Sequence, residues 1–409
     1  MTQTRSKCEV DAADTEIMAN VPESFSDVES LLRTECPKHP VYCIYPHVYS
    51  EIATEFLEGF PGRVLYAVKA NPDPTILKLL TDSGVRHFDC ASLPEIELVD
   101  TIVPGAKKYF MTPARIRGAA AMAQEKHGVR HFVVDHLSGL SQLIEEIEPS
   151  GAVIFARMAV HHKSAMEDLS ARFGAPTEEM PALLQAIRDS GAEPALAFNV
   201  GSSVTDPEAY RYSMSVTKSV LEKLPFRIRL LDVGGGYPKS YPGFIVPGLE
   251  QYFRAVAESV TTLPLADNAE VLGEPGRALS APGMSAVVEV LLRKDHRLYL
   301  NDGMFGIFWV LRIDGPDRFP VRAYRGGKPL EGNTMEFQVN GPTCDSTDTL
   351  PGLVPLPVDI GPGDYLEFGN IGAYSIGGRT DYNGFYSDRI VTITSPTERP
   401  PEVQEDDRN

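Results

Sequence analysis

Short apolar runs alternate with longer amphipathic segments over most of the first 280 residues. The short runs are rich in β-branched and aromatic residues, which favour strands, whereas the longer segments are rich in Ala, Leu and Glu, which favour helices. The predicted strands are residues 63–69, 86–90, 108–112, 131–135, 152–157, 195–200, 227–233 and 269–274. The predicted helices are residues 74–84, 93–103, 114–128, 137–147, 178–191 and 249–263. This alternation of strands and helices predicts a TIM-like (β/α)8 barrel of the α/β class.

The pattern changes after residue 280, where short apolar runs are separated by Gly, Pro and Asp turns. Such a succession of short strands predicts an all-β domain. Its predicted strands are residues 287–294, 296–302, 308–314, 319–325, 336–341, 365–370 and 389–395. A further strand within residues 36–46 precedes the barrel and is expected to join this β domain.

At the two ends of the chain, apolar residues are not spaced with the period of a helix or a strand. Residues 1–35 are polar and acidic and are expected to form a flexible leader, and the Pro-rich, charged residues 397–409 are expected to form a flexible tail. The predicted domains are therefore a barrel over residues 36–280 and a β domain over residues 281–396.

Composition narrows the classes of function. The chain has 38 Lys and Arg against 56 Asp and Glu, a net charge of −18, which argues against nucleic acid or anionic membrane as a partner and favours a cationic small molecule. The N-terminus lacks the apolar core of a signal peptide, and no apolar run approaches the ~20 residues that span a bilayer. Five scattered cysteines without a CxxC pair indicate neither a disulfide scaffold nor a zinc site, so we expect a cytoplasmic protein without a metal.

Polar residues and a glycine triplet fall at the ends of the predicted barrel strands. They are Lys69, Asp89, Asp135, Arg157, Asn199, the glycines 234–236 and Glu274. Strand ends converge on one face of a barrel, where active sites are built. One such lysine is more often a solvated strand edge, but this many positions on one face favour a functional site.

These residues suggest a cofactor. Lys69 lies among apolar neighbours in YAVKAN, where burial would lower its pKa and make it a nucleophile, although taken alone this feature favours a snorkelling lysine on a strand. Glycines let backbone N–H groups approach an anion, and Arg277 adds a permanent cation suited to phosphate. A lysine for an imine, the Glu274 carboxylate for a ring nitrogen and a phosphate cradle together fit pyridoxal 5'-phosphate (PLP).

Longer motifs make the pattern specific. YAVKANPDPTILKLL, FNVGSS, LDVGGGYP, GEPGR and GPTCDSTD resemble segments of the eukaryotic-type ornithine decarboxylases, which are alanine racemase-like, fold-type III enzymes. The matching segments extend from about residue 40 to residue 390 and keep the same order. The resemblance implies a PLP-dependent decarboxylase that converts a basic L-amino acid, ornithine or lysine, to a diamine and carbon dioxide.

The resemblance also implies roles for residues around the cofactor. Lys69 would bind its aldehyde, and Glu274 would keep its pyridine nitrogen protonated. Its phosphate would be held by Ser202, Gly235, Gly236, Gly276, Arg277 and Tyr374. Asp89, Glu95, Arg157 and Asn199 would surround the lysine and the ring.

Other positions would act on the substrate. Cys344 matches the catalytic cysteine thought to control protonation after carbon dioxide leaves. Asp345 and Asp314 match acids that bind the distal ammonium, and Tyr382 matches an aromatic residue beside the substrate. In this family Cys344 and Asp345 would be donated across the interface of a homodimer.

The chain departs from the family pattern in a few places. Asn199 stands where the family has a histidine that stacks on the cofactor, and Phe305 stands where a tyrosine is common. Arg379 would admit a second anionic group on the substrate if it pointed inward, although an outward arginine is equally expected. His161 and His162 are interpreted as loop residues. Two alternatives stay open: a decarboxylase of another, pathway-specific amino acid, and a non-catalytic PLP-binding homologue that regulates a decarboxylase.

Overall fold

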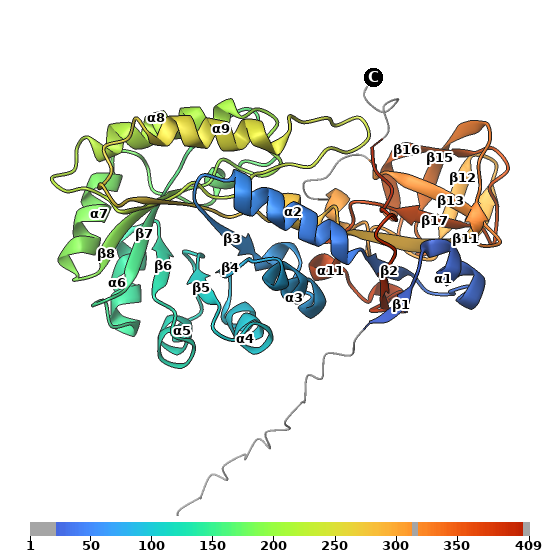
Figure 1. The fold of residues 1–409 in the computed structure, drawn as a ribbon, viewed down its shortest axis with the longest axis horizontal. Coiled ribbons are helices and arrows are strands. Elements are labelled where there is room, and N and C mark those ends of the chain that lie inside the picture. Colours follow the sequence, from blue (N-terminus) through green and yellow to red (C-terminus); the bar gives the residue numbers. More distant parts are fainter. Residues whose placement is uncertain (1–21, 313–317, 404–409) are drawn as a thin grey trace, which may run out of the picture.

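The computed structural model describes residues 22–312 and 318–403 of the chain. A parallel barrel is formed by the middle of the sequence, and a β domain built from both ends of the chain lies beside it (Figure 1). This arrangement confirms the predicted TIM-like barrel with a C-terminal, mostly β domain. Within the described ranges, no helix has the length and apolar character required to cross a bilayer.

Eight parallel strands close the barrel, and each overlaps one of the predicted strands. They are β3 (Arg63–Ala67), β4 (His87–Cys90), β5 (Lys107–Phe110), β6 (His131–Val134), β7 (Val153–Met158), β8 (Glu193–Phe198), β9 (Leu230–Asp232) and β10 (Glu270–Gly273). Buried side chains such as Leu65, Tyr109 and Phe155 pack together inside the barrel. The barrel is therefore filled, and ligands are left with the face at the carboxyl ends of its strands.

Helices cover the outside of the barrel. Those that fall within predicted segments are α3 (Pro74–Asp82), α4 (Leu93–Ile102), α5 (Ala119–His127), α6 (Leu137–Glu146), α7 (Met180–Asp189) and α9 (Leu249–Val260). Sequence reasoning missed α2 (Pro46–Gly59) and α8 (Glu208–Leu221). Both helices contain Tyr, Ser, Thr and Val, which are weaker helix formers, but buried tyrosines such as Tyr49 and Tyr210 anchor them to the core.

The β domain is one ten-stranded sheet. Its strands are β1 (Glu23–Phe25), β2 (Val41–Ile44), β11 (Met284–Lys294), β12 (Arg297–Leu300), β13 (Val321–Arg325), β14 (Lys328–Pro329), β15 (Thr334–Asn340), β16 (Thr349–Pro357), β17 (Tyr365–Phe368) and β18 (Ile390–Ile393). The strand expected within residues 36–46 is β2, which pairs with β11 and β18.

The ends of the chain are more structured than expected. Within the segment expected to be a leader, β1 pairs with β18, and α1 (Val28–Glu35) buries Val28, Leu31 and Leu32 against the sheet. The described part of the expected tail is also packed, because Pro400 and Pro401 are buried. The acidic composition concealed a short amphipathic helix whose apolar face is small.

One predicted strand is wrong. Residues 309–312 of the segment 308–314 form a 3-10 helix, η3 (Trp309–Arg312), instead of a strand. Buried Phe308 and Val310 account for the apolar run that resembled a strand. The η3 helix contacts α11 (Ser375–Gly378), and both lie near the mouth of the barrel.

Candidate active site

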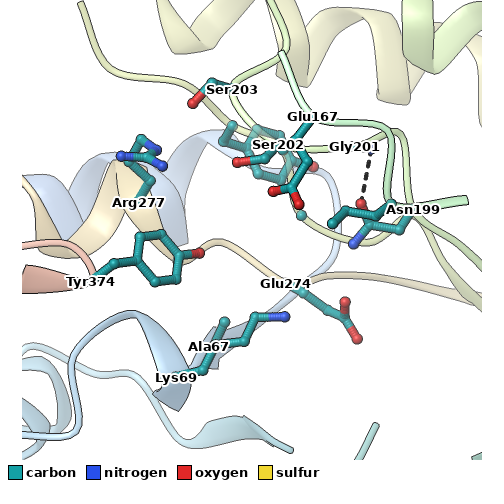
Figure 2. Close-up of a pocket in the computed structure, with 15 residues that line it drawn as sticks. Ala67, Lys69, Glu167, Asn199, Gly201, Ser202, Ser203, Glu274, Arg277 and Tyr374 are labelled. Carbon is teal, nitrogen blue, oxygen red and sulfur yellow. Dashed lines mark hydrogen bonds between the residues drawn. The ribbon is translucent and has the colours of Figure 1, made fainter. Parts of the chain in front are cut away.

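Lys69 lies at the mouth of the barrel, directly after its first strand. β3 ends at Ala67, and the short helix η1 (Val68–Ala70) carries the lysine. The side chain exposes its surface to two cavities of about 260 and 460 Å³, although protein surrounds the amine closely. Figure 2 shows this amine directed toward Glu274, which follows β10.

The smaller cavity collects residues from several strand ends. It is lined by Ala67, Lys69, Glu167, Leu169, Asn199, Gly201, Ser202, Ser203, Gly235, Gly236, Tyr237, Glu274, Gly276, Arg277 and Tyr374. Most of the cofactor residues predicted from the sequence are therefore in one place (Figure 2). Arg277 is buried at the first turn of α10 (Arg277–Ser280), and its guanidinium lies 5.1 Å from the centre of the Tyr374 ring.

Glycines shape the wall of this cavity. A Cβ at Gly235 would lie 2.7 Å from the Glu274 carbonyl oxygen, and one at Gly236 would lie 2.8 Å from the Gly201 carbonyl oxygen. Gly236 also has φ of +101°, a left-handed conformation that favours glycine. Ser203 also has a positive φ, +46°, which is an uncommon conformation for a residue with a side chain. Strained backbone of this kind gathers at ligand sites.

The charge state of Lys69 differs from the sequence-based expectation. Burial lowers the pKa of Lys69, but the Asp89 carboxyl and other nearby acidic groups outweigh that effect, so the pKa lies above its ordinary value. Asp89 is buried at the end of β4, and burial together with Glu274 raises its pKa well above the ordinary range. The amine is therefore held as an ammonium beside carboxyl groups that can accept its proton.

Glu274 is paired with a second acid that sequence reasoning did not single out. Asp232 is fully buried at the end of β9, and its Oδ1 accepts the N–H of Gly234 at 2.8 Å. Burial raises the pKa of Asp232 to about 7, and burial followed by Asp232 raises the pKa of Glu274 to about 8. One proton shared between the two carboxyls relieves their repulsion, and a cation at Glu274 would do the same.

Asn199 supports the backbone of the cavity. Its side chain is buried, and its Oδ1 accepts the N–H of Gly201 at 3.0 Å (Figure 2). The amide thus fixes the turn that presents Gly201 and Ser202 to the cavity.

Asp89 and Arg157 do not line the cavity, but both interact electrostatically with Lys69. Arg157, on β7, lies 5.6 Å from the centre of the Phe173 ring, and its Nε is buried without a hydrogen-bond partner. Glu95, in the first turn of α4, accepts the N–H of Ala91 at 2.7 Å and lines the larger cavity.

The predicted substrate residues of the β domain lie apart from Lys69. Cys344 and Asp345 occupy the loop between β15 and β16, and neither lines either of the two cavities. Cys344 is exposed and its Sγ lies 3.9 Å from Asn383 Oδ1. Tyr382 is exposed at the start of η4 (Tyr382–Gly384) and stacks on Phe305 at 4.4 Å. Asp314 lies outside the described residues.

Arg379 is held away from the cavities. Its guanidinium donates to the Ser387 carbonyl oxygen at 2.6 Å and lies between the Tyr42 and Tyr386 rings. His161 interacts with Asp168 Oδ2 at 2.7 Å through Nδ1, so it behaves as a loop residue. Among the residues that the structure describes, no group of three or more His, Cys, Asp or Glu side chains is arranged to hold a metal ion.

Comparisons with known proteins identify the family. The profile described as "Pyridoxal-dependent decarboxylase, pyridoxal binding domain" matches residues 49–281. The lysine/ornithine decarboxylase of Selenomonas ruminantium is 31% identical over 354 residues, which cover 84% of this chain and 86% of that protein. The chain belongs to the pyridoxal-dependent decarboxylases of the ornithine/lysine decarboxylase family.

Other relatives agree in fold and differ in name. The lysine/ornithine decarboxylase of Vibrio vulnificus, solved with putrescine, has a TM-score of 0.78 and 25% identity, covering 90% of this chain and 97% of that one. Antizyme inhibitor 2 of Xenopus laevis is 30% identical over 363 residues, covering 81% of this chain and 75% of that protein. Decarboxylases of basic amino acids and an antizyme inhibitor are thus both related to this chain.

Several lining residues of this decarboxylase-family site were not predicted individually. Ser203 is the last residue of the motif FNVGSS, and Tyr237 directly follows the glycine triplet, so both positions could have been included. Glu167 gave no signal because it lies in an irregular segment after β7 that carries no periodic pattern, whereas Leu169 begins the short helix η2 (Leu169–Ala171) and was not singled out.

Proposed function

We propose that this protein is a PLP-dependent decarboxylase that converts a basic L-amino acid, ornithine or lysine, to a diamine and carbon dioxide. The observation that carries this proposal is the shared cavity of Lys69, Glu274 and a glycine-rich cradle that ends at Arg277. A lysine, a carboxylate and an anion cradle in one cavity are the three groups that PLP requires of a protein.

The residues present fit this cofactor. Added side chains at Gly235, Gly236 or Gly276 would fill the cradle, since a Cβ at Gly276 would come 3.1 Å from Ala70 Cβ and 3.2 Å from the Tyr374 hydroxyl. Tyr237 also lines this cavity, and its hydroxyl is buried beside Tyr210. Backbone N–H groups, Ser202 and the Arg277 guanidinium would hold the phosphate.

Each residue then has a definite task. When bound, PLP supplies an electron sink for the charge left on the substrate Cα after carbon dioxide departs. Lys69 would hold the cofactor aldehyde, and Asp89 would take the proton that the ammonium must lose. Glu274 would hold a proton on the ring nitrogen, because its buried carboxyl gains a cationic partner there.

The substrate residues would come from a second copy of the chain. Cys344 and Asp345 are absent from the lining of both cavities that Lys69 lines, yet they belong to an exposed loop. In a homodimer this loop would complete the site of the partner, with Asp345 pairing the distal ammonium and Cys344 acting on protonation. Asp314 and Tyr382 are proposed to contact the same substrate.

The larger cavity supports a substrate with an aliphatic stem. It is lined mainly by apolar groups, which include Leu98 and Trp309, and Lys69 and Tyr374 separate it from the cofactor cavity. The net charge of −18 favours approach of a cationic amino acid. The described cysteines are all unpaired, which fits a reducing compartment such as the cytoplasm.

The proposal is tested by carbon dioxide release from a panel of L- and D-amino acids with added PLP. We expect release from L-ornithine or L-lysine and a visible absorbance band that Lys69→Ala abolishes. The control Lys126→Ala, which removes an exposed lysine of α5, should keep both the carbon dioxide release and the absorbance band. An unchanged band in Lys69→Ala would reject the role of this lysine.

A second candidate is favoured by Asn199 and by the similarity to antizyme inhibitor 2. In that case the protein would bind PLP without releasing carbon dioxide from any amino acid, and it would regulate a true decarboxylase. Release from an amino acid other than ornithine and lysine would favour a pathway-specific decarboxylase instead. The panel therefore separates the three functions.

A further inference from the structure

The segment that follows β7 is tied to the wall of the cofactor cavity. The N–H of Met166 donates to the Ser202 carbonyl oxygen at 3.0 Å, and the N–H of Ser202 donates to the Glu167 carbonyl oxygen at 3.0 Å. The N–H of Thr205 donates to the Ser164 carbonyl oxygen at 2.9 Å. Residues 164–167 therefore run beside residues 202–205.

The contact between these two segments is tight. A Cβ at Gly201 would lie 2.4 Å from Ala165 Cβ and 2.5 Å from the Glu167 carbonyl oxygen, and Gly201 has φ of +110°. Any larger residue at 201 would push the two segments apart. The backbone of Glu167 is thus held at a defined position next to Ser202.

The Glu167 side chain enters the cavity from this position. Figure 2 shows its carboxylate directed into the interior from the wall that carries Ser202 and Ser203. The charged groups among the lining residues are then Lys69, Arg277, Glu274 and Glu167. The first three have a task in the proposed function, whereas Glu167 has none.

A carboxylate in an anion cradle has a predictable effect. A bound phosphate carries close to two negative charges, and like charges that share one cavity repel each other. Glu167 therefore opposes the same phosphate that Arg277 and the glycine backbone attract.

We propose that Glu167 sets the affinity of this site for PLP by opposing the cofactor phosphate, so that the protein exchanges its cofactor more readily than the cradle alone would permit. This inference rests on the proposed function and assigns a role to a residue outside the motifs that define it. Because the effect is a charge repulsion, it acts on the phosphate of the cofactor and spares the ring and the aldehyde.

The test compares four full-length proteins, the wild type and three variants, each freed of PLP and titrated with it, with binding read from absorbance. Glu167→Gln keeps the shape of the side chain and removes its charge, and it should bind PLP about tenfold more tightly, a difference of about 1.4 kcal/mol. Inorganic phosphate, used as a competitor of PLP, should also bind Glu167→Gln more tightly than the wild type, by a similar factor. Pyridoxal, which lacks the phosphate, should bind equally to Glu167→Gln and the wild type.

Asp168→Asn provides the matched control. Asp168 is the next residue, it is exposed, and its carboxylate interacts with His161 outside the cavity lining. This variant should bind PLP and phosphate as the wild type does. Glu167→Ala serves as a second charge-removing variant, and it should shift affinity in the same direction.

The outcomes are distinct. Unchanged or weaker PLP binding in both Glu167 variants would overturn the role of Glu167. An increase in affinity for pyridoxal equal to that for PLP would overturn it as well. Absence of a PLP absorbance change in the wild type would instead overturn the proposed function. A gain in Asp168→Asn equal to that in Glu167→Gln would show that the overall charge of the segment, rather than Glu167, decides the affinity.

Discussion

Lys69 is surrounded by groups from other strands, and these neighbours decide its protonation state. Its immediate sequence, YAVKAN, indicated an apolar environment and a lowered pKa. In the folded chain, Asp89 from β4 and Glu274 after β10 reach the same amine, and the pKa of Lys69 is raised in spite of burial. An environment made by residues 20 and 205 positions away in sequence is invisible in the local motif.

Asn199 allows a prediction at the same scale. Asn199→Ala removes the oxygen that accepts the Gly201 N–H, so the turn that presents Ser202 should loosen. We expect PLP affinity to fall several-fold, in line with the roughly 1 kcal/mol net value of one hydrogen bond. The measurement is the absorbance titration with PLP.

Asn199→Ser is the companion variant, because a serine hydroxyl can still accept a backbone N–H nearby. Its PLP affinity should fall between those of the wild type and Asn199→Ala. Wild-type affinity in Asn199→Ala would mean that the turn holds its shape without the amide.

At the scale of elements, the barrel strands could be predicted from the sequence, whereas the helices and the segments around them were predicted less completely. Buried β-strands are short continuous apolar runs, and all eight were found from that signal. Helix α8 was missed because its tyrosines and serines are weak helix formers, and tertiary packing of Tyr210 overrides that preference. The 308–314 run was misassigned because a buried 3-10 turn and a buried strand have the same composition.

The amino ends of the barrel strands carry a cluster that should make stability depend on pH. His87 and His131 flank Tyr109, whose hydroxyl is bonded to Arg63 Nη1 and His87 Nδ1 at 3.1 Å. Burial, followed by the positive charge of Arg63, lowers the pKa of each histidine from 6.5 to about 4. Both rings are therefore neutral in the folded protein at pH 7.

The direction in which stability changes with pH follows from the difference in proton binding between the folded and the unfolded chain. The unfolded chain binds protons at these histidines near pH 6.5, whereas the folded chain binds them only near pH 4. The stability contributed by the neutral rings is complete above pH 6.5 and is lost as the pH falls toward 4. Because the rings are partly exposed, we expect about 1–2 kcal/mol for each.

Thermal unfolding at pH 7 and at a pH just above 4 checks this expectation. Between pH 7 and the lower pH, the melting temperature of His131→Gln should fall less than that of the wild type, because one titrating ring is gone. His296→Gln, which removes an exposed histidine, should behave as the wild type. Equal acid sensitivity in wild type and His131→Gln would place the effect elsewhere.

At the scale of the whole molecule, the exposed surface around Cys344 resembles an interface. Tyr382, Phe385 and Tyr386 are each about 40% exposed or more, and Asn383 among them contacts Cys344. Aromatic residues gathered on a surface are enriched in the cores of protein interfaces. The motif GPTCDSTD identified Cys344 as a catalytic candidate, and in the proposed homodimer this cysteine would act in the site of the other copy, since it lines neither cavity of its own chain.

Mixing two inactive variants tests whether sites are shared. If the protein forms the proposed homodimer, Lys69→Ala and Cys344→Ala should each have little activity on their own. In a mixed dimer, one site would combine both substitutions, and the other would combine an intact Lys69 with an intact Cys344 from the partner. With random exchange, half of the dimers are mixed and one site in each is intact, so about a quarter of wild-type activity should return.

The control for this mixture replaces Cys344→Ala by the double variant Lys69→Ala/Cys344→Ala, which provides no intact lysine and should restore nothing. If each chain instead carried a complete site, both partners of every dimer would keep their own defect, and mixing would leave the activity at the sum of the two variants. Recovery would therefore require that Cys344 act on the Lys69 of the other chain, and this arrangement would account for the absence of the cysteine from both cavities beside Lys69.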